Sequence, residues 1–343
     1  MSNVFVGMGS YFPKQVLTND QLEQASRSFN AKAKGCSLDA WVKRMHGAAT
    51  RHRAAPGEAT SDLAVRAARR ALDDAGVDIR DVDLILMATI TGDQRWPQTA
   101  AAVQRQLGSD ARCLQLNSAC SGFVDAMMVA DNLMNAGASE LALVLTAECF
   151  TGLFHPDDFL PLSVFGDGAG ALVLRRRPDL TEYGARCYVT GSDGDLGDYI
   201  IAQAGGSKRP IDAARLADGE HYVKLRFSEI GSWALNRFAH CAREAIRRAG
   251  LTPADIKCVV PHQASAKLVD RLAKALEMPR ELFVVTYPEL GNTSSASIPT
   301  ALERAFAEHK FKDGDFILMP AAGSGMAWGA LVYRWFDYRQ HAN

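Results

Sequence analysis

The amino-acid sequence predicts an α/β fold built from two similar halves. Residues 70–87 and 244–261 share one pattern: an amphipathic helix, a glycine suited to a left-handed helix cap, a short loop and a continuous apolar run. Ala75–Gly76 of the first segment matches Ala249–Gly250 of the second at an offset of 174 residues. Because helices alternate with buried strands along the chain, we expect layered sheets that are covered by helices.

Two further pairs of segments extend the repeat. Residues 141–145 match residues 315–319 at the same offset, and both segments are typical of buried strands. Residues 166–175 match residues 325–334 at the shorter offset of 159, which places extra residues of the first half in a loop near residues 147–164. The matches divide the chain into two predicted halves, residues 1–178 and residues 179–343.

Composition and charge exclude several classes of protein. Apolar residues make up 48% and charged residues 22% of the 343 residues, which is typical of a globular chain. The net charge of −1 argues against nucleic-acid binding through bulk positive charge. No apolar run approaches the roughly 18 residues of a membrane span. The first residues lack the pattern of a signal peptide, and the seven scattered cysteines indicate a reducing compartment, so we expect a cytoplasmic protein that binds neither nucleic acid nor membrane.

Cys120 has the sequence context of a nucleophile. It follows an apolar strand and several small residues, and it precedes a helix whose buried face is formed by Phe123, Met127, Ala130 and Met134. The N–H groups at a helix N-terminus favour a thiolate. No Cys-x-x-Cys pair occurs, so the sequence predicts neither a disulfide framework nor a metal site. We expect the other cysteines to be structural: Cys36, Cys113, Cys149, Cys187, Cys241 and Cys258.

His262 and Asn292 are candidate partners of this cysteine. His262 follows a buried strand and corresponds, through the repeat, to position 88 at the end of the equivalent strand. Asn292 lies in a small-residue turn before a helix and corresponds to position 118, two residues before Cys120. A pseudo-twofold relation of the halves would therefore bring both helix starts to one site. The turn at Gly323–Gly325 can direct N–H groups at an oxyanion, although a tight turn without chemical function is an equal alternative.

Four segments of the chain together resemble β-ketoacyl-(acyl carrier protein) synthase III. They read Asn-Ser-Ala-Cys-Ser-Gly-Phe at 117–123, Phe-Gly-Asp-Gly-Ala-Gly-Ala at 165–171, Val-Pro-His-Gln-Ala at 260–264 and Gly-Asn-Thr-Ser-Ser-Ala-Ser at 291–297. The resemblance covers essentially the whole chain, in order. It implies a thiolase-like fold, in which duplicated βαβαβαβ halves form five α-β-α-β-α layers, and a homodimer.

The resemblance also implies a two-stage reaction without a cofactor or a metal ion. Cys120 takes an acyl group from acyl-CoA or from acyl carrier protein (ACP). Malonyl-ACP then loses CO₂, and the resulting carbanion attacks the acyl-enzyme to release β-ketoacyl-ACP, in fatty acid or specialised acyl and polyketide biosynthesis. His262 and Asn292 donate to the malonyl thioester carbonyl as enolate charge develops, and the backbone N–H groups of Cys120 and Ser324 bind the tetrahedral oxyanion.

Substrate and carrier contacts follow from the same resemblance. Trp41 and Arg44 match positions at the mouth of a pantetheine tunnel, and Trp96 matches the place where a partner subunit closes the acyl pocket. Three basic residues lie at i, i+4 and i+7 on the helix after His262 and match or flank positions that contact ACP: Lys267, Arg271 and Lys274. A solvated helix face is the alternative explanation of that basic stripe.

Two other functions remain open from the sequence. Gly152 and Ser232 replace an arginine and a lysine with which the family holds CoA, while Ser265 and Ser324 replace an asparagine and a glycine. These changes are compatible with a related acyltransferase that passes the Cys-bound acyl group to a non-malonyl acceptor. A catalytically inactive subunit that serves only as a dimer partner is a third hypothesis, which the complete Cys-His-Asn set disfavours.

Overall fold

The computed structural model describes residues 2–341 and contains two large sheets. The first sheet has five strands, in the spatial order β1 (Ser2–Tyr11), β7 (Gly168–Arg177), β6 (Leu141–Glu148), β4 (Leu84–Ala88) and β5 (Arg112–Leu116). The second sheet has four strands, in the order β8 (Gly184–Ser192), β13 (Ala327–Arg334), β12 (Phe316–Gly323) and β11 (Ile256–Val259).

The two sheets repeat one strand order. In each sheet the first two pairs are antiparallel and the third is parallel, so β1-β7-β6-β4 corresponds to β8-β13-β12-β11. A parallel bridge between Val259 and Phe283 lies where β5 pairs with β4 in the first sheet. The internal duplication is therefore confirmed. The division near residue 178 stays a prediction, and this position falls between the end of β7 at Arg177 and the start of β8 at Gly184.

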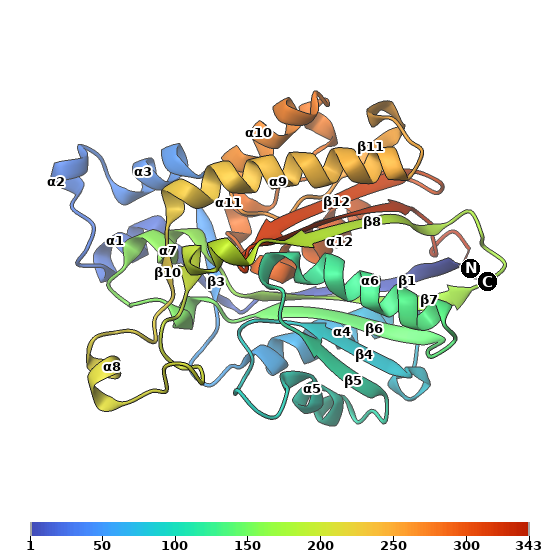
Figure 1. The fold of residues 1–343 in the computed structure, drawn as a ribbon, viewed down its shortest axis with the longest axis horizontal. Coiled ribbons are helices and arrows are strands. Elements are labelled where there is room, and N and C mark those ends of the chain that lie inside the picture. Colours follow the sequence, from blue (N-terminus) through green and yellow to red (C-terminus); the bar gives the residue numbers. More distant parts are fainter. Residues whose placement is uncertain (1, 342–343) are drawn as a thin grey trace.

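Helices cover both outer faces of the sheets and fill the space between them (Figure 1). The first sheet carries α4 (Thr60–Ala75) and α5 (Thr99–Leu107) on its outside, and the second carries α9 (Phe227–Arg248) and α10 (Ala266–Leu276). Between the sheets lie α6 (Gly122–Asn135) and α12 (Ser297–Ala307). The predicted five-layer α-β-α-β-α architecture is confirmed.

The central layer is apolar because it is packed against a sheet on each side. Phe123, Met127, Ala130 and Met134 of α6 are all buried in the core between the sheets, and burial of each large side chain contributes about 1.5–3 kcal/mol. On the outer face of the first sheet, the close approach of a helix to a strand determines the residue type instead. A Cβ on Gly7 of β1 would lie 2.3 Å from a backbone oxygen of α4, so only glycine lets this helix pack directly on the strand.

The inserted segment of the first half is more ordered than the loop that the sequence predicts. Between β6 and β7 it forms η3 (Thr151–Leu153) and α7 (Phe159–Val164). The rings of Phe150 and Phe165 stack at 4.8 Å, and Phe159 packs edge-on against Trp41 at 5.5 Å. These aromatic contacts supply the apolar burial that a bare loop lacks, and they place the insertion over the site.

The remaining elements lie near the inserted segment or connect the layers. They are β2 (Gln15–Thr18), β3 (Thr50–Arg53), β9 (Ile200–Ile201), β10 (Lys224–Leu225), α1 (Asn19–Ala25), α2 (Ala31–Lys34), α3 (Leu38–Met45), α8 (Ala213–Ala217), α11 (Tyr287–Leu290) and the short turns η1 (Ile79–Asp81), η2 (Ala119–Ser121), η4 (Gly194–Tyr199), η5 (Pro253–Asp255), η6 (Arg280–Leu282) and η7 (Ser294–Ala296). Within residues 2–341, no helix is long and apolar enough to cross a membrane.

Candidate active site

One cavity of about 580 Å³ brings the main candidate residues together. Cys120 reaches it from the turn before α6, His262 from the loop after β11, and Asn292 from the turn that leads to α12. Gly323, the last residue of β12, and Ser324, which follows it, complete this wall of the cavity. The two halves of the chain therefore contribute to a single site, as the repeat predicts.

Cys120 lies on a tight turn, η2, directly before α6. Ala119 has a φ of +46°, a left-handed conformation that is uncommon for a residue with a side chain and that turns the cysteine toward the cavity. The end of β12 approaches this turn closely. A Cβ on Gly323 would lie 2.5 Å from the Cβ of Cys120 and 3.0 Å from its Sγ, so glycine is required at this position.

Burial governs the thiol in the ligand-free protein. It raises the pKa of Cys120 to about 11, and the nearby Glu148 carboxylate adds to that increase. Three donors act in the opposite direction: the Ser294 hydroxyl, at 3.5 Å from Sγ, and the backbone N–H groups of Ser324 and Cys120. The cysteine does lie at a helix N-terminus, but burial outweighs the helix effect, and the resting group is a thiol rather than the thiolate that the sequence favours.

His262 is a buried, neutral imidazole. Burial lowers its pKa to about 3, and the ring lies parallel to Phe238 with centroids 6.3 Å apart. Its Nδ1 is 2.7 Å from Oγ of Ser297, which leaves Nε2 for the cavity. The Ser297 hydroxyl can donate either to this nitrogen or to the Ser294 carbonyl oxygen 2.8 Å away, so Ser297 is positioned to set the tautomer of His262.

Asn292 is held in one orientation. Its Oδ1 accepts a hydrogen bond from the Ser294 N–H at 2.8 Å, so Nδ2 is the amide donor that remains for the cavity. Its backbone N–H donates to Val164 at 2.8 Å, which ties the turn to the inserted segment. Gln263, which the sequence analysis did not single out, accepts from the N–H of Thr286 at 3.0 Å and so joins the loops that carry His262 and Asn292.

The other predicted contact residues divide into two groups. Trp41, Lys267 and Arg271 line the cavity that holds Cys120, the latter two from exposed positions on α10. Three others do not line it: Lys274, Arg44 and Trp96. Lys274 is exposed farther along α10, and the Arg44 carbonyl oxygen accepts a hydrogen bond from Nζ of Lys267. Trp96 is 86% exposed, which is exceptional for a tryptophan.

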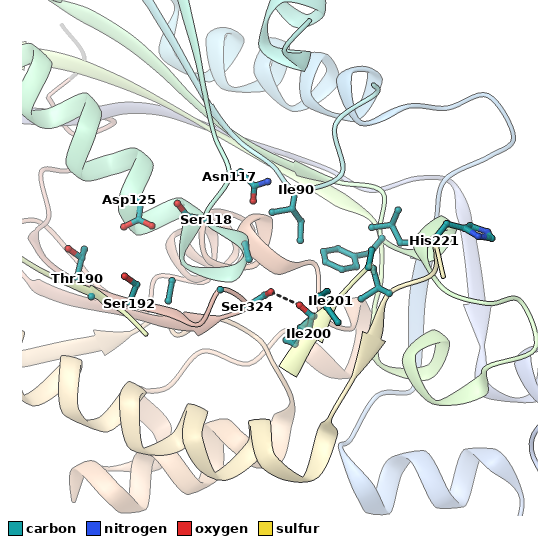
Figure 2. A pocket seen from close by; sticks show the side chains of 18 residues that line it. Ile90, Asn117, Ser118, Asp125, Thr190, Ser192, Ile200, Ile201, His221 and Ser324 are labelled. Atoms are coloured by element: carbon teal, nitrogen blue, oxygen red, sulfur yellow. Dashed lines mark hydrogen bonds between the residues drawn. The ribbon is translucent and has the colours of Figure 1, made fainter. Parts of the chain in front are cut away.

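A second cavity, of about 670 Å³, lies beyond Ala119 and Ser324 and shares both residues with the first (Figure 2). Ile90, Phe150 and Ile200 also line both cavities. Figure 2 shows a polar end of this space with the side chains of Asn117, Ser118, Asp125, Thr190 and Ser192. The two cavities are therefore adjacent and share a largely apolar wall.

Glu148 is a buried carboxylate that the sequence analysis missed. Its Oε2 accepts hydrogen bonds from the hydroxyl of Thr91 at 2.8 Å and from Thr89 and the Ile90 N–H at 3.2 Å, and its Oε1 accepts from Ser295 at 2.9 Å. Burial nevertheless raises its pKa to about 7. The signal in the sequence was an acidic residue at the end of an apolar strand. Across residues 2–341, no group of three or more His, Cys, Asp or Glu side chains could hold a metal ion.

Comparisons with known proteins identify the family of this chain. Residues 114–194 match the family model for 3-oxoacyl-[acyl-carrier-protein (ACP)] synthase III, and residues 246–335 match the model for its C-terminal part. The chain is 37% identical over 330 residues to a β-ketoacyl-[acyl-carrier-protein] synthase III of Roseiflexus sp. (strain RS-1), which covers 96% of this chain and 97% of that relative. It is also 37% identical over 338 residues to the enzyme of the same name from Rhodospirillum centenum, with 98% and 99% covered.

Solved structures give the same result. The crystal structure of 3-oxoacyl-[acyl-carrier-protein] synthase III from Aquifex aeolicus superposes with a TM-score of 0.86 at 32% identity, over 97% of this chain and all of that one, 100%. The corresponding structure from Pseudomonas aeruginosa has a TM-score of 0.86 at 33% identity, with 98% of each chain covered. The thiolase fold expected from the sequence is confirmed, and the chain belongs to the β-ketoacyl-[acyl-carrier-protein] synthase III family.

Proposed function

We propose that this chain is a condensing enzyme that joins an acyl group on Cys120 to the decarboxylated malonyl unit of malonyl-ACP. One observation carries the proposal: a thiol, an imidazole and an amide donor line one cavity, beside backbone N–H groups that approach the thiol. The full-length similarity to enzymes of this name supports it. The side chains and the backbone supply all the chemistry, so the proposal needs no cofactor or metal ion.

In the first stage Cys120 sulfur forms a bond to the carbonyl carbon of the donor thioester. The oxygen of the tetrahedral intermediate carries negative charge, and the N–H groups of Cys120 and Ser324, which approach the sulfur, are the proposed donors to this oxygen. The bond to the donor sulfur then breaks, and the proton lost by Cys120 ends on the departing thiol. The product is an acyl-enzyme with its chain directed past Ile90 and Phe150, which line both cavities.

In the second stage the malonyl thioester loses CO₂, and the negative charge moves to its carbonyl oxygen as an enolate. Nε2–H of His262 and Nδ2–H of Asn292 are the proposed donors to that oxygen. This role needs the tautomer in which Ser297 donates to Nδ1, so that the ring proton is on Nε2. The enolate carbon attacks the acyl carbon, the carbon–sulfur bond breaks, and Cys120 recovers a proton as β-ketoacyl-ACP leaves.

Partners and compartment are part of the same proposal. Trp41 lines the cavity on the side of α10, where pantetheine would enter, and the exposed basic residues of α10 would contact the acidic carrier protein. A homodimer would cover Trp96 and bring it against the partner's acyl pocket. The reaction would take place in the cytoplasm, because all seven cysteines are free and a reducing compartment keeps them so.

Intact-protein mass spectrometry tests the proposal. The protein is incubated with acyl-CoA and acyl-ACP donors of short, medium and long chain, and malonyl-ACP is then added. We expect an acyl adduct that is absent from Cys120→Ala and that is discharged as a β-ketoacyl product. His262→Ala should still form the adduct but should decarboxylate malonyl-ACP far more slowly.

Three outcomes would contradict the proposal or one of its assigned roles. An adduct that forms on Cys120 but is not discharged by malonyl-ACP would favour the acyltransferase, and other acceptors would then be tested. The absence of an adduct with every donor would favour the inactive subunit. Decarboxylation by His262→Ala at the wild-type rate would refute the role given to this residue.

A further inference from the structure

Ser294 contacts the three residues of the proposed catalytic set. Its hydroxyl donates to Sγ of Cys120 at 3.5 Å, and its N–H donates to Oδ1 of Asn292 at 2.8 Å. Its carbonyl oxygen lies 2.8 Å from Oγ of Ser297 and within hydrogen-bonding reach of the His262 ring. No part of the reaction described above uses the hydroxyl of this residue.

The backbone of Ser294 is held in an unfavourable conformation. Its φ is +50°, in the left-handed region, where a residue with a side chain is uncommon. Ser294 opens the turn η7 before α12, just as Ala119, with a φ of +46°, opens the turn η2 before α6. Such conformations cost about 1–3 kcal/mol and persist only where the surroundings hold them. This geometry directs the Ser294 hydroxyl across the boundary between the halves and onto the thiol.

The next residue, Ser295, anchors the turn through a hydrogen bond to a buried carboxylate. Ser295 donates to Oε1 of Glu148 at 2.9 Å, and this carboxylate is itself held by donors from the loop after β4. Ser294 and Ser295 are both at most 1% exposed, so water does not compete for their hydroxyl groups. The hydroxyl at Ser294 is thus fixed before any substrate binds.

We propose that the Ser294 hydroxyl is a further catalytic group, which donates a hydrogen bond to the Cys120 thiolate whenever sulfur carries negative charge. The proposal rests on the function proposed above. Charge develops on this sulfur twice: when the thiol gives up its proton and attacks the donor thioester, and when the final intermediate expels it. In both steps the serine keeps its own proton, which the sulfur accepts only as a hydrogen bond.

The contribution of the Ser294 hydroxyl should be large enough to measure. A hydrogen bond to a charged group is roughly twice as strong as one between neutral groups, so the Ser294 donor favours the thiolate over the thiol. Of the contacts that lower the pKa of Cys120 against the effect of burial, the one with this hydroxyl is the largest. The helix N-terminus and two backbone N–H groups remain when the hydroxyl is removed, so its removal should weaken the nucleophile without abolishing it.

The test measures the alkylation of Cys120 by iodoacetamide between pH 7 and pH 11, with peptide mass mapping to separate the seven cysteines. The variants are Ser294→Ala, Ser294→Gly and Ser295→Ala. Glycine removes the hydroxyl and suits the positive φ, so it separates the chemistry from backbone strain. Ser295→Ala is the matched comparison, because it removes an equally buried hydroxyl of the same turn that points to Glu148 instead of Cys120.

We expect the alkylation rate at pH 8 to fall about tenfold in both Ser294 variants, with a higher apparent pKa of Cys120, because a donor to a charged group is lost. Ser295→Ala should change the rate by less than about twofold. Equal rates in wild type and Ser294→Gly, or an equal fall in Ser295→Ala, would overturn the proposal. Alkylation needs no acyl donor, so this result does not depend on whether the enzyme condenses malonyl units.

Discussion

Replacing Gly323 by alanine should disrupt the site through a single methyl group. The added Cβ would lie 2.5 Å from the Cβ of Cys120, 2.9 Å from its backbone nitrogen and 3.0 Å from its Sγ. The first two atoms belong to a tight turn at the start of a helix, so they cannot rotate away as the end of a flexible side chain can. Either the turn at Ala119–Ser121 or the end of β12 has to move.

The size of the movement sets the size of the effect. Restoring an ordinary 3.4 Å contact requires a shift of roughly 1 Å between the two backbones. Overpacking of this kind costs about 1–3 kcal/mol of stability, and a 1 Å displacement of a reacting group costs about a hundredfold in rate. The shift also separates the Ser324 N–H from the sulfur, so Cys120 loses a donor as well as its position.

The acylation rate of Cys120, followed by intact mass, measures the effect, and thermal unfolding measures the stability. Gly152→Ala is the control, because no atom lies within 4 Å of a Cβ at that position. We expect Gly323→Ala to acylate about a hundredfold more slowly and Gly152→Ala to acylate like the wild type. If Gly323→Ala acylates within about twofold of the wild type, the close packing described here does not control the nucleophile.

Three further predictions concern other parts of the molecule. Burial raises the pKa of Glu148 from 4.5 to about 7, so the folded protein should lose stability as the pH rises from 4.5 to about 7 and this buried group ionises. Glu148→Gln should remove this loss, so urea unfolding should differ from that of the wild type by up to about 3 kcal/mol at pH 8 but not at pH 4.5. If the free energies of unfolding of the variant and the wild type change in parallel with pH, the prediction is refuted. Lys274→Glu should raise KM several-fold for malonyl-ACP but not for a small malonyl thioester, and the difference should shrink at high salt. Trp96→Ala should weaken the proposed homodimer at least tenfold in analytical ultracentrifugation, because a covered tryptophan is a typical hot spot; a dimer of unchanged stability would place Trp96 outside the interface.

The architecture could be predicted from the sequence because the chain carries it twice. The segments 141–145 and 315–319 become β6 and β12, which occupy equivalent places in the two sheets. Their common offset predicts, without any knowledge of contacts, which segments of the two halves correspond. Cys120, His262 and Asn292 follow from the same repeat together with the small-residue turns around them, and all three line one cavity.

The parts that escaped prediction depend on contacts between distant residues. The bond from Ser294 to Cys120 joins residues 174 positions apart, and the bond from Ser295 to Glu148 joins residues 147 apart. No local pattern encodes either contact. The inserted segment forms α7 instead of a loop because Phe159 packs against Trp41, which lies far away in the sequence. The resting thiol was missed for a related reason, since the sequence shows the helix start but not the depth of its burial.

The duplication also accounts for the single nucleophile of the proposed mechanism. Both halves contain the same arrangement, in which a residue with left-handed backbone conformation begins a turn before a central helix. The end of a strand from the other half packs against that turn: β12 packs on η2, and β6 packs on η7. The difference lies in the residue that ends each strand. Gly323 ends β12 and leaves room for the sulfur of Cys120 and for the N–H of Ser324. Glu148 ends β6 and fills the equivalent space with a carboxylate that binds the Ser295 hydroxyl. The second turn then has no room for a reacting group, and its first residue, Ser294, acts in the proposed mechanism on the cysteine of the first turn.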